Sequence, residues 1–174
     1  MKKVTYLTES AKKFSREEAI AEAKRCLLCE EAYCNKKCPI NSNPKEFIEL
    51  VATEQFDKAI GLIRDNNPLF YSICTRVCPY DSYCVGGCRN SKLADDPIMI
   101  PFIQKYLVDY CDETDEIISS GNVEPKKVGQ KVAIIGSGPA GLAAAAVLGQ
   151  KGYEVTVFEA KKEVGGWLSY GIPP

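Results

Sequence analysis

Eight of the nine cysteines lie between residues 26 and 88, where they form two tight groups. The first group has the spacing Cys-x2-Cys-x4-Cys-x3-Cys and consists of Cys26, Cys29, Cys34 and Cys38. The second has the spacing Cys-x3-Cys-x5-Cys-x3-Cys and consists of Cys74, Cys78, Cys84 and Cys88. Thiols that only fill a core would not cluster in this way. We therefore expect these groups to bind metal or to carry redox chemistry, and the ninth cysteine, Cys111, to be an inert thiol.

Two other uses of cysteine have to be weighed against iron. The N-terminal segment MKKVTYLTES lacks the apolar stretch of a secretory signal, so we expect a cytoplasmic protein, and disulfides are rare in that compartment. Zinc favours pairs of Cys-x2-Cys or mixed Cys/His sets, but the chain has one Cys-x2-Cys and no histidine. Closely spaced cysteines, some followed directly by proline, are typical of iron–sulfur sites. The two groups therefore predict two iron–sulfur clusters.

The spacing does not decide how the ligands divide between the clusters. One cluster for each sequence group is the simplest division. In two-cluster ferredoxins, however, the cysteine before proline binds the other cluster, which would pair Cys38 and Cys78 across the groups. Gly86 and Gly87 come just before the last cysteine, and we expect them to let backbone N–H groups approach cluster sulfurs.

Composition divides the chain into a helical iron–sulfur domain over 1–112, a polar linker over 113–130 and a strand–loop–helix–strand pattern over 131–174. We therefore expect a mainly α fold followed by an incomplete α/β Rossmann-type βαβ unit. A covered parallel sheet needs further βα units, so we expect a piece of a longer protein. The net charge of −1, and no apolar run of about 18 residues, give no reason to expect nucleic acid or a membrane as a partner.

Local signals predict where the helices begin. Ser15 followed by Glu18 is a capping box, and the buried face of the helix after it is expected to contain Ala19, Ile20, Ala23 and Leu27. Asn43 before Pro44 predicts the N-cap and the first residue of a second helix. Further helices are expected over 56–63, 69–77 and 100–110, the last with a core face of Phe102, Tyr106 and Tyr110.

The third zone carries a dinucleotide-binding fingerprint. A strand over 131–135, the loop GSGPAG, a helix over 142–150 and a strand over 153–158 follow one another in the required order. Gly136 is expected to make the turn, Gly138 to let the backbone approach a pyrophosphate, and Gly141 to allow close helix–strand packing. Glu159, 18 residues after Gly141, is placed to bind a ribose hydroxyl. The candidate cofactor-binding residues are Gly136, Gly138, Pro139, Ala140, Gly141, Glu159 and Gly166.

The segments RCLLCEEAYCNKKCP, NNPLFYSICTRVCPYDSYCVGGC and PIMIPFIQKY resemble the N-terminal dicluster domain of dihydropyrimidine dehydrogenase and of the glutamate synthase small subunit. The resemblance implies one [4Fe–4S] cluster held by Cys26, Cys29, Cys34 and Cys88. It implies a second held by Cys38, Cys78, Cys84 and Gln104, with Cys74 as a non-ligand. Glutamine at this last position is typical of the dihydropyrimidine dehydrogenase branch, whereas the glutamate synthase branch has glutamate.

Gly165 and Gly166 after the acidic residue resemble the FAD fingerprint of pyridine nucleotide–disulfide oxidoreductases, and VGGWLSYGIP resembles the electron-input subunit of bacterial NAD-dependent dihydropyrimidine dehydrogenase. These resemblances imply an oxidoreductase subunit that passes electrons from NAD(P)H through FAD and two [4Fe–4S] clusters. The partner would be an FMN-containing, pyrimidine-reducing subunit. The alternatives are a glutamate synthase small subunit with its large subunit as partner, an NADPH–ferredoxin transhydrogenase subunit, a non-catalytic electron-transfer or docking module, and a zinc-stabilised interaction domain.

Overall fold

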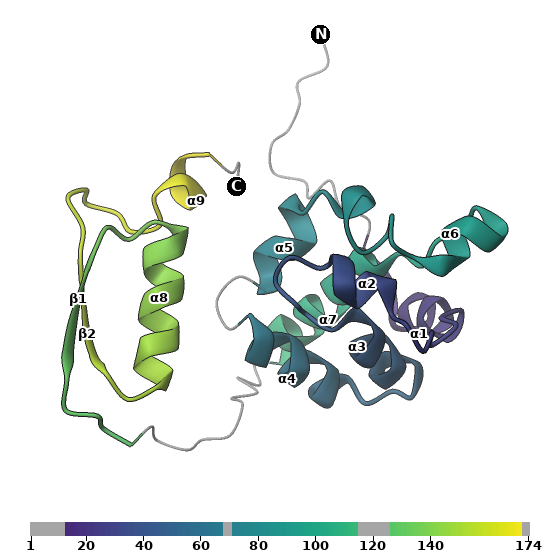
Figure 1. Cartoon of the computed structure of the whole chain (residues 1–174), viewed down its shortest axis with the longest axis horizontal. Helices are drawn as coiled ribbons and strands as arrows, with labels where there is room; N and C mark the ends of the chain where they lie inside the picture. The colour runs from purple at the N-terminus through teal and green to yellow at the C-terminus, as the bar shows by residue number, and fades with distance from the viewer. Residues whose placement is uncertain (1–12, 68–70, 115–125, 172–174) are drawn as a thin grey trace, which may run out of the picture. The chain divides into compact units, whose positions relative to one another are not determined.

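The computed structural model describes residues 13–67, 71–114 and 126–171. These residues belong to two compact units, one within Ala11–Ser120 and one within Gly121–Pro174. In its described part the first unit contains helices and no strand, and the second contains a βαβ unit (Figure 1). The fold is therefore mainly α followed by a Rossmann-type βαβ unit, as the sequence predicts.

The helical unit is organised around its third and seventh helices. Its elements are α1 (Arg16–Lys24), α2 (Tyr33–Lys37), α3 (Pro44–Ala52), α4 (Phe56–Asn66), α5 (Tyr71–Val77), the 3-10 turn η1 (Tyr80–Ser82), α6 (Arg89–Ala94) and α7 (Ile100–Thr114). Helix α3 packs against α1 and α4, and α7 packs against α1, α4 and α5. The cysteine-bearing segments therefore surround a central set of packed helices.

The core of this unit lies between α3, α4 and α7. Its most completely buried apolar side chains include Phe47, Ile60, Ile63, Ile103 and Leu107. Burial of one such side chain stabilises the fold by about 1.5–3 kcal/mol. The predicted aromatic face of α7 is confirmed for Tyr106, which is buried and meets Phe56 edge-on at 5.5 Å between ring centroids. Phe102 and Tyr110 lie partly buried at the edge of the core.

The start of α1 confirms the predicted capping box. The Ser15 hydroxyl accepts a hydrogen bond from the N–H of Glu18 at 3.2 Å, and the Glu18 carboxylate accepts one from the N–H of Ser15 at 2.8 Å. Ala19 and Ala23 are buried as predicted. The prediction for Leu27 is wrong, because α1 ends at Lys24 and this side chain is 51% exposed in the following loop.

Helix α3 begins at Pro44 as predicted, but Asn43 does not cap it. Asn43 has a left-handed backbone with φ of 51° and makes no side-chain capping bond, whereas a capping side chain reaches the helix from an extended backbone. The N–H of Lys45 donates instead to Oδ1 of Asn35 at 2.9 Å, and Nδ2 of Asn35 donates to the Glu46 carboxylate at 2.8 Å. A residue of α2 therefore caps α3.

Several boundaries differ from those predicted. Helix α4 continues past residue 63 to Asn66, and α7 continues past residue 110 to Thr114. Residues 68–70, the predicted start of α5, lie outside the described residues, as do 115–125 of the expected linker. The short helices α2 and α6 were not predicted, because five or six residues show no apolar period. The domain division at 112 and 130 stays a prediction.

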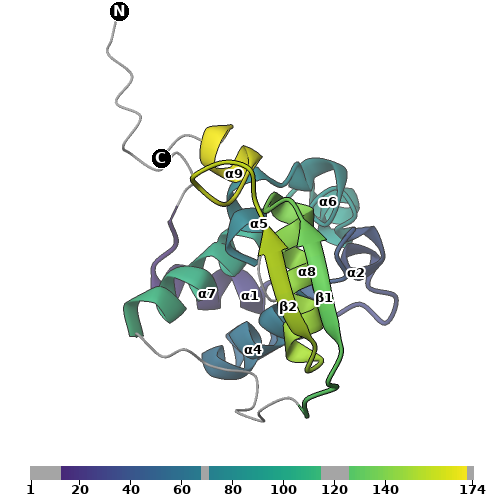
Figure 2. The same cartoon turned by 90° about the vertical axis from the view of Figure 1, so that its left-hand side faces the viewer.

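The second unit is a parallel βαβ arrangement. Strands β1 (Lys131–Ile135) and β2 (Glu154–Phe158) pair in parallel, and α8 (Pro139–Gln150) packs against both (Figure 2). Helix α8 starts before the predicted residue 142, because Pro139 takes the first helical position and Gly138 is the N-cap. A short helix, α9 (Trp167–Tyr170), follows. Within the described ranges, every helix is too short or too polar to cross a lipid bilayer.

Candidate metal centres and dinucleotide loop

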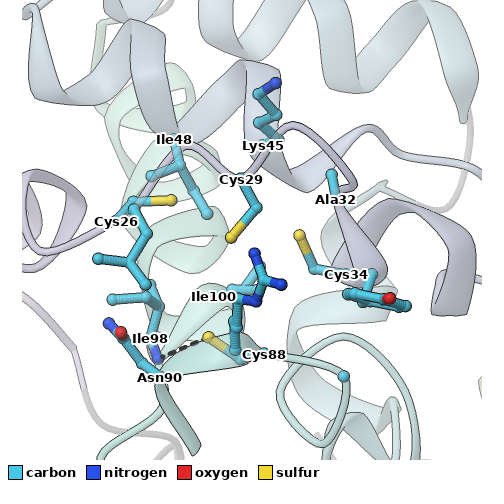
Figure 3. Close-up of a pocket in the computed structure, with 14 residues that line it drawn as sticks. Cys26, Cys29, Ala32, Cys34, Lys45, Ile48, Cys88, Asn90, Ile98 and Ile100 are labelled. Carbon is cyan, nitrogen blue, oxygen red and sulfur yellow. Dashed lines mark hydrogen bonds between the residues drawn. The ribbon is translucent and has the colours of Figure 1, made fainter. Parts of the chain in front are cut away.

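Four cysteines from three segments of the helical unit surround one cavity. They are Cys26 and Cys29 in the loop after α1, Cys34 in α2 and Cys88 at the start of α6. Figure 3 shows their sulfur atoms facing the space between them, with Ile48, Ile98 and Ile100 along the wall. The first cavity therefore offers four thiols in a mainly apolar setting.

The thiols of the first cavity are protonated at neutral pH while they carry no metal. Burial raises the pKa of the Cys34 thiol to about 11 and also raises that of Cys26. The N–H of Ile98 donates a hydrogen bond to Sγ of Cys88 at 3.5 Å (Figure 3). Protonated thiols are poor nucleophiles, but a metal ion displaces the proton and binds the thiolate. This cavity is therefore suited to metal binding, and assembly of a metal centre there would release protons.

A second cavity of the same unit is lined by four cysteines and a glutamine, Cys38, Cys74, Cys78, Cys84 and Gln104. Burial raises the pKa of the Cys84 thiol to about 12. Gln104 is 7% exposed, and its Nε2 donates to the carbonyl of Tyr71 at 3.3 Å. Because a carbonyl can only accept, this bond identifies the nitrogen end of the amide and leaves the oxygen as the atom able to bind a metal.

Two cysteines were expected not to bind a cluster. Cys74 lines the second cavity together with the predicted ligands, and its sulfur accepts a hydrogen bond from Nδ2 of Asn67 at 3.4 Å. Its exclusion as a ligand therefore stays a prediction. Cys111 is 6% exposed in α7, lines neither of these cavities, and lies 3.7 Å from Nη1 of Arg64. This placement agrees with a core thiol.

The cavities divide the cysteines across the two sequence groups. Cys34 and Cys38, near the two ends of α2, line different cavities, and so do Cys84 and Cys88 on either side of the glycine pair. Binding of iron by each thiol remains a prediction. No group of three or more His, Cys, Asp or Glu side chains in the described part of the chain is spaced for a single metal ion. Ligands of a four-iron cluster lie farther apart than ligands of one ion, because each binds a different iron.

The glycine pair has a role in packing rather than the one predicted. The N–H of Gly87 donates to the carbonyl of Tyr83 at 2.8 Å, so it is not directed at a sulfur. A Cβ atom on Gly86 would overlap the carbonyl oxygen of Asp81. The two glycines therefore let this loop close tightly, and the closure carries the last two cysteines of the group to separate cavities.

The sequence did not point to two polar residues beside the cavities, Asn35 and Ser42. Asn35 joins α2 to α3, as described above. Ser42 is 3% exposed and lies against the thiol of Cys38. A hydroxyl residue shortly after a Cys-Pro turn is the signal by which Ser42 could have been found.

The glycine loop joins β1 to α8. Gly136 has φ of +93°, and a Cβ atom on Gly141 would overlap the carbonyl oxygen of Gly136, so both positions require glycine. The space beside Gly138 is open, with nothing within 4 Å of an added Cβ atom. Pro139 and Ala140 form the first turn of α8. The loop thus presents an uncovered helix N-terminus, which is suited to an anion.

Glu159 folds back onto this loop. One carboxylate oxygen accepts hydrogen bonds from the hydroxyl and N–H of Ser137 at 2.5 and 2.8 Å, and the other accepts one from the N–H of Lys161 at 2.9 Å. These bonds, first that from the Ser137 hydroxyl, lower the pKa of Glu159 to about 2. A Cβ atom on Gly166 would lie 3.0 Å from Cα of Gly138. A permanent anion and the second glycine pair therefore both lie against the loop.

Known proteins resemble both parts of the chain. The family described as dihydropyrimidine dehydrogenase domain II, 4Fe-4S cluster, matches residues 3–116, and that described as NAD(P)-binding Rossmann-like domain matches residues 134–171. The NAD-dependent dihydropyrimidine dehydrogenase subunit PreT of Escherichia coli is 42% identical over 174 residues, which are 99% of this chain and 41% of the relative. The glutamate synthase [NADPH] small chain of Azospirillum brasilense is 35% identical over 165 residues, 92% of this chain and 33% of the relative. The chain spans less than half the length of these curated relatives.

Proposed function

Because the chain belongs to the family of dihydropyrimidine dehydrogenase domain II, 4Fe-4S cluster, we propose that it is the electron-transfer part of an NAD(P)H-dependent iron–sulfur flavoprotein. Electrons would pass from NAD(P)H through FAD and two [4Fe–4S] clusters to a partner subunit that contains FMN and reduces a pyrimidine. The flavin accepts a hydride and the clusters carry single electrons. The residues of this chain hold and tune these groups, and none of them is proposed as an acid–base catalyst.

The observation that carries the proposal is the pair of cavities, each lined by enough donor atoms for one cluster. We propose that the first is held by Cys26, Cys29, Cys34 and Cys88. We propose that the second is held by Cys38, Cys78, Cys84 and Gln104. Thiolates are the usual ligands of such clusters, and partial burial limits the access of water. The nine cysteines are free thiols, which suits the reducing cytoplasm.

Gln104 gives the second site a different charge from the first. Its amide is neutral, so the cluster with its ligands would carry one negative charge fewer than a cluster with four thiolates. Net charge is one of the factors that set cluster potential, and less negative charge favours the reduced form. We therefore propose that Gln104 raises the reduction potential of the second cluster.

FAD is the proposed ligand of the glycine loop. The match to an NAD(P)-binding Rossmann-like domain supports a dinucleotide, because NAD(P) and FAD share this fingerprint. The glycines at 165 and 166 favour FAD. The N-terminus of α8 would face the pyrophosphate, and the Glu159 carboxylate would accept a hydrogen bond from a ribose hydroxyl.

Two other functions have specific support. Similarity to glutamate synthase [NADPH] small chains supports a glutamate synthase small subunit, with the large subunit as partner, or the related NADPH–ferredoxin transhydrogenase. Glutamine rather than glutamate at position 104 favours the pyrimidine branch. A docking module would bind clusters and a partner but no flavin, so retention of FAD through gel filtration would count against it.

The test of the proposal is the metal content of the full chain purified without oxygen. Two four-iron clusters require about eight irons and eight sulfides per chain. We expect that content, with a broad visible absorption that bleaches on reduction. Fewer than about four irons, together with stoichiometric zinc, would overturn the proposal.

A further inference from the structure

Ser42 directs two hydrogen bonds at one predicted ligand. Its Oγ lies 3.2 Å from Sγ of Cys38, and its N–H donates to the same sulfur at 3.4 Å. The residue is 3% exposed, so water does not compete freely for its hydroxyl. A thiolate bound to iron has no proton to give. In the ligated state the serine hydroxyl must therefore be the donor.

The backbone holds Ser42 in this position. The N–H of Asn41 donates to the carbonyl of Cys38 at 3.1 Å, which closes a turn after the Cys-Pro pair. Asn41 and Asn43, on either side of the serine, both have left-handed backbones with φ of 53° and 51°. Pro44 follows, is buried, and starts α3. The serine is therefore fixed between a tight turn and a packed helix, so its bonds to the sulfur require little further ordering.

We propose that Ser42 is a positioning residue that raises the reduction potential of the second cluster by hydrogen bonding to the Cys38 thiolate. This inference rests on the proposed function, because it requires Cys38 to bind a cluster. Hydrogen bonds to ligand sulfurs draw negative charge from the centre, and the reduced form, which carries more negative charge, gains most from them. In the first cavity the bond to Cys88 comes from the backbone of Ile98, which no side-chain substitution removes.

The experiment compares Ser42→Ala and Ser42→Thr with the unmodified full chain. Each is titrated anaerobically with dithionite, and both clusters are followed by electron paramagnetic resonance. We expect Ser42→Ala to make reduction of one cluster about tenfold less favourable, a shift of ~59 mV for a one-electron couple, and to leave the other unchanged. Ser42→Thr keeps a hydroxyl and should restore the potential. The matched control is Ser82→Ala, an exposed serine between Cys78 and Cys84, which should change neither potential.

The outcomes separate this inference from the function on which it rests. An unmodified chain without clusters would overturn both. Two intact clusters whose potentials do not respond to Ser42→Ala, or respond equally, would overturn the role of Ser42 alone. Should Ser42→Ala lose the second cluster, the unmodified chain supplies the test through electron–nuclear double resonance. A hydroxyl proton that exchanges in D2O and couples to the second cluster would support the inference, and its absence would overturn it.

Discussion

Asn35 ties α2 to α3 through two hydrogen bonds, and its removal should weaken the helical unit. Its Oδ1 accepts from the N–H of Lys45 at 2.9 Å, and its Nδ2 donates to the Glu46 carboxylate at 2.8 Å. The N–H of Lys45 belongs to the first turn of α3, where backbone donors have no partner within the helix. A capping bond of this kind contributes about 0.5–2 kcal/mol, and an exposed bond adds a few tenths. We therefore expect Asn35→Ala to lower the free energy of unfolding by about 1–2 kcal/mol.

The measurement is the thermal midpoint of the full chain with its clusters, followed by circular dichroism. For a unit of roughly 100 residues, 1 kcal/mol corresponds to about 4–8 °C, so we expect the midpoint to fall by at least about 4 °C. Helix α2 carries one predicted ligand and precedes another, so both clusters should also be lost faster to an iron chelator.

The control for this prediction is Asn66→Ala, which removes a bond from an exposed asparagine to the carbonyl of Leu62 at the end of α4. It should change the midpoint little. Asn35→Asp keeps an acceptor for the N–H of Lys45 but places a second carboxylate beside Glu46, so it should recover part of the loss. A decrease for Asn35→Ala no larger than that for Asn66→Ala would refute the capping argument.

Three further substitutions test the sites. Gln104→Glu adds a negative charge at the second cavity and should lower the potential of one cluster in a potentiometric titration, whereas an unchanged pair of potentials would contradict its role as a ligand. Cys74→Ser should leave about eight irons per chain, and loss of about four would identify this residue as a ligand. Ser137→Ala should raise the pKa of Glu159 from about 2 toward its ordinary value of 4.5 in a carboxyl NMR titration. Because that pKa is depressed in the folded chain, the stability it contributes is present above about pH 4.5 and is lost as the pH falls through about 2; an unshifted pKa in the variant would refute the role of Ser137.

Features that depend on neighbouring residues were predictable from the sequence. The capping box at Ser15 and the strand–loop–helix order around Gly136 are set within a few positions of the chain, and the structure contains both. The cap of α3 was not predictable, because its acceptor, Asn35, belongs to another helix. Asn43 carries the residue type of a cap but not the extended backbone that a cap requires.

The candidate site shows the same limit. The cysteines could be recognised as a set from their spacing, but the spacing alone did not divide them. Cys34 and Cys38 are close enough in sequence to share one site, yet they line different cavities. The division had to come from resemblance to a family. Ser42 could not be found in either way, because its contact with Cys38 depends on the left-handed turn at Asn41.

The proposed exchange of ligands between the two sequence groups is tested most directly at the cysteines on either side of two short segments. Iron, sulfide and electron paramagnetic resonance are measured for the full chain, purified without oxygen, with single serine substitutions at Cys34, Cys38, Cys84 and Cys88. We predict about four irons in each variant. The Cys34 and Cys88 variants should lose one cluster, and the Cys38 and Cys84 variants should lose the other. Loss of the same cluster from Cys34→Ser and Cys38→Ser would contradict the proposed pair of centres.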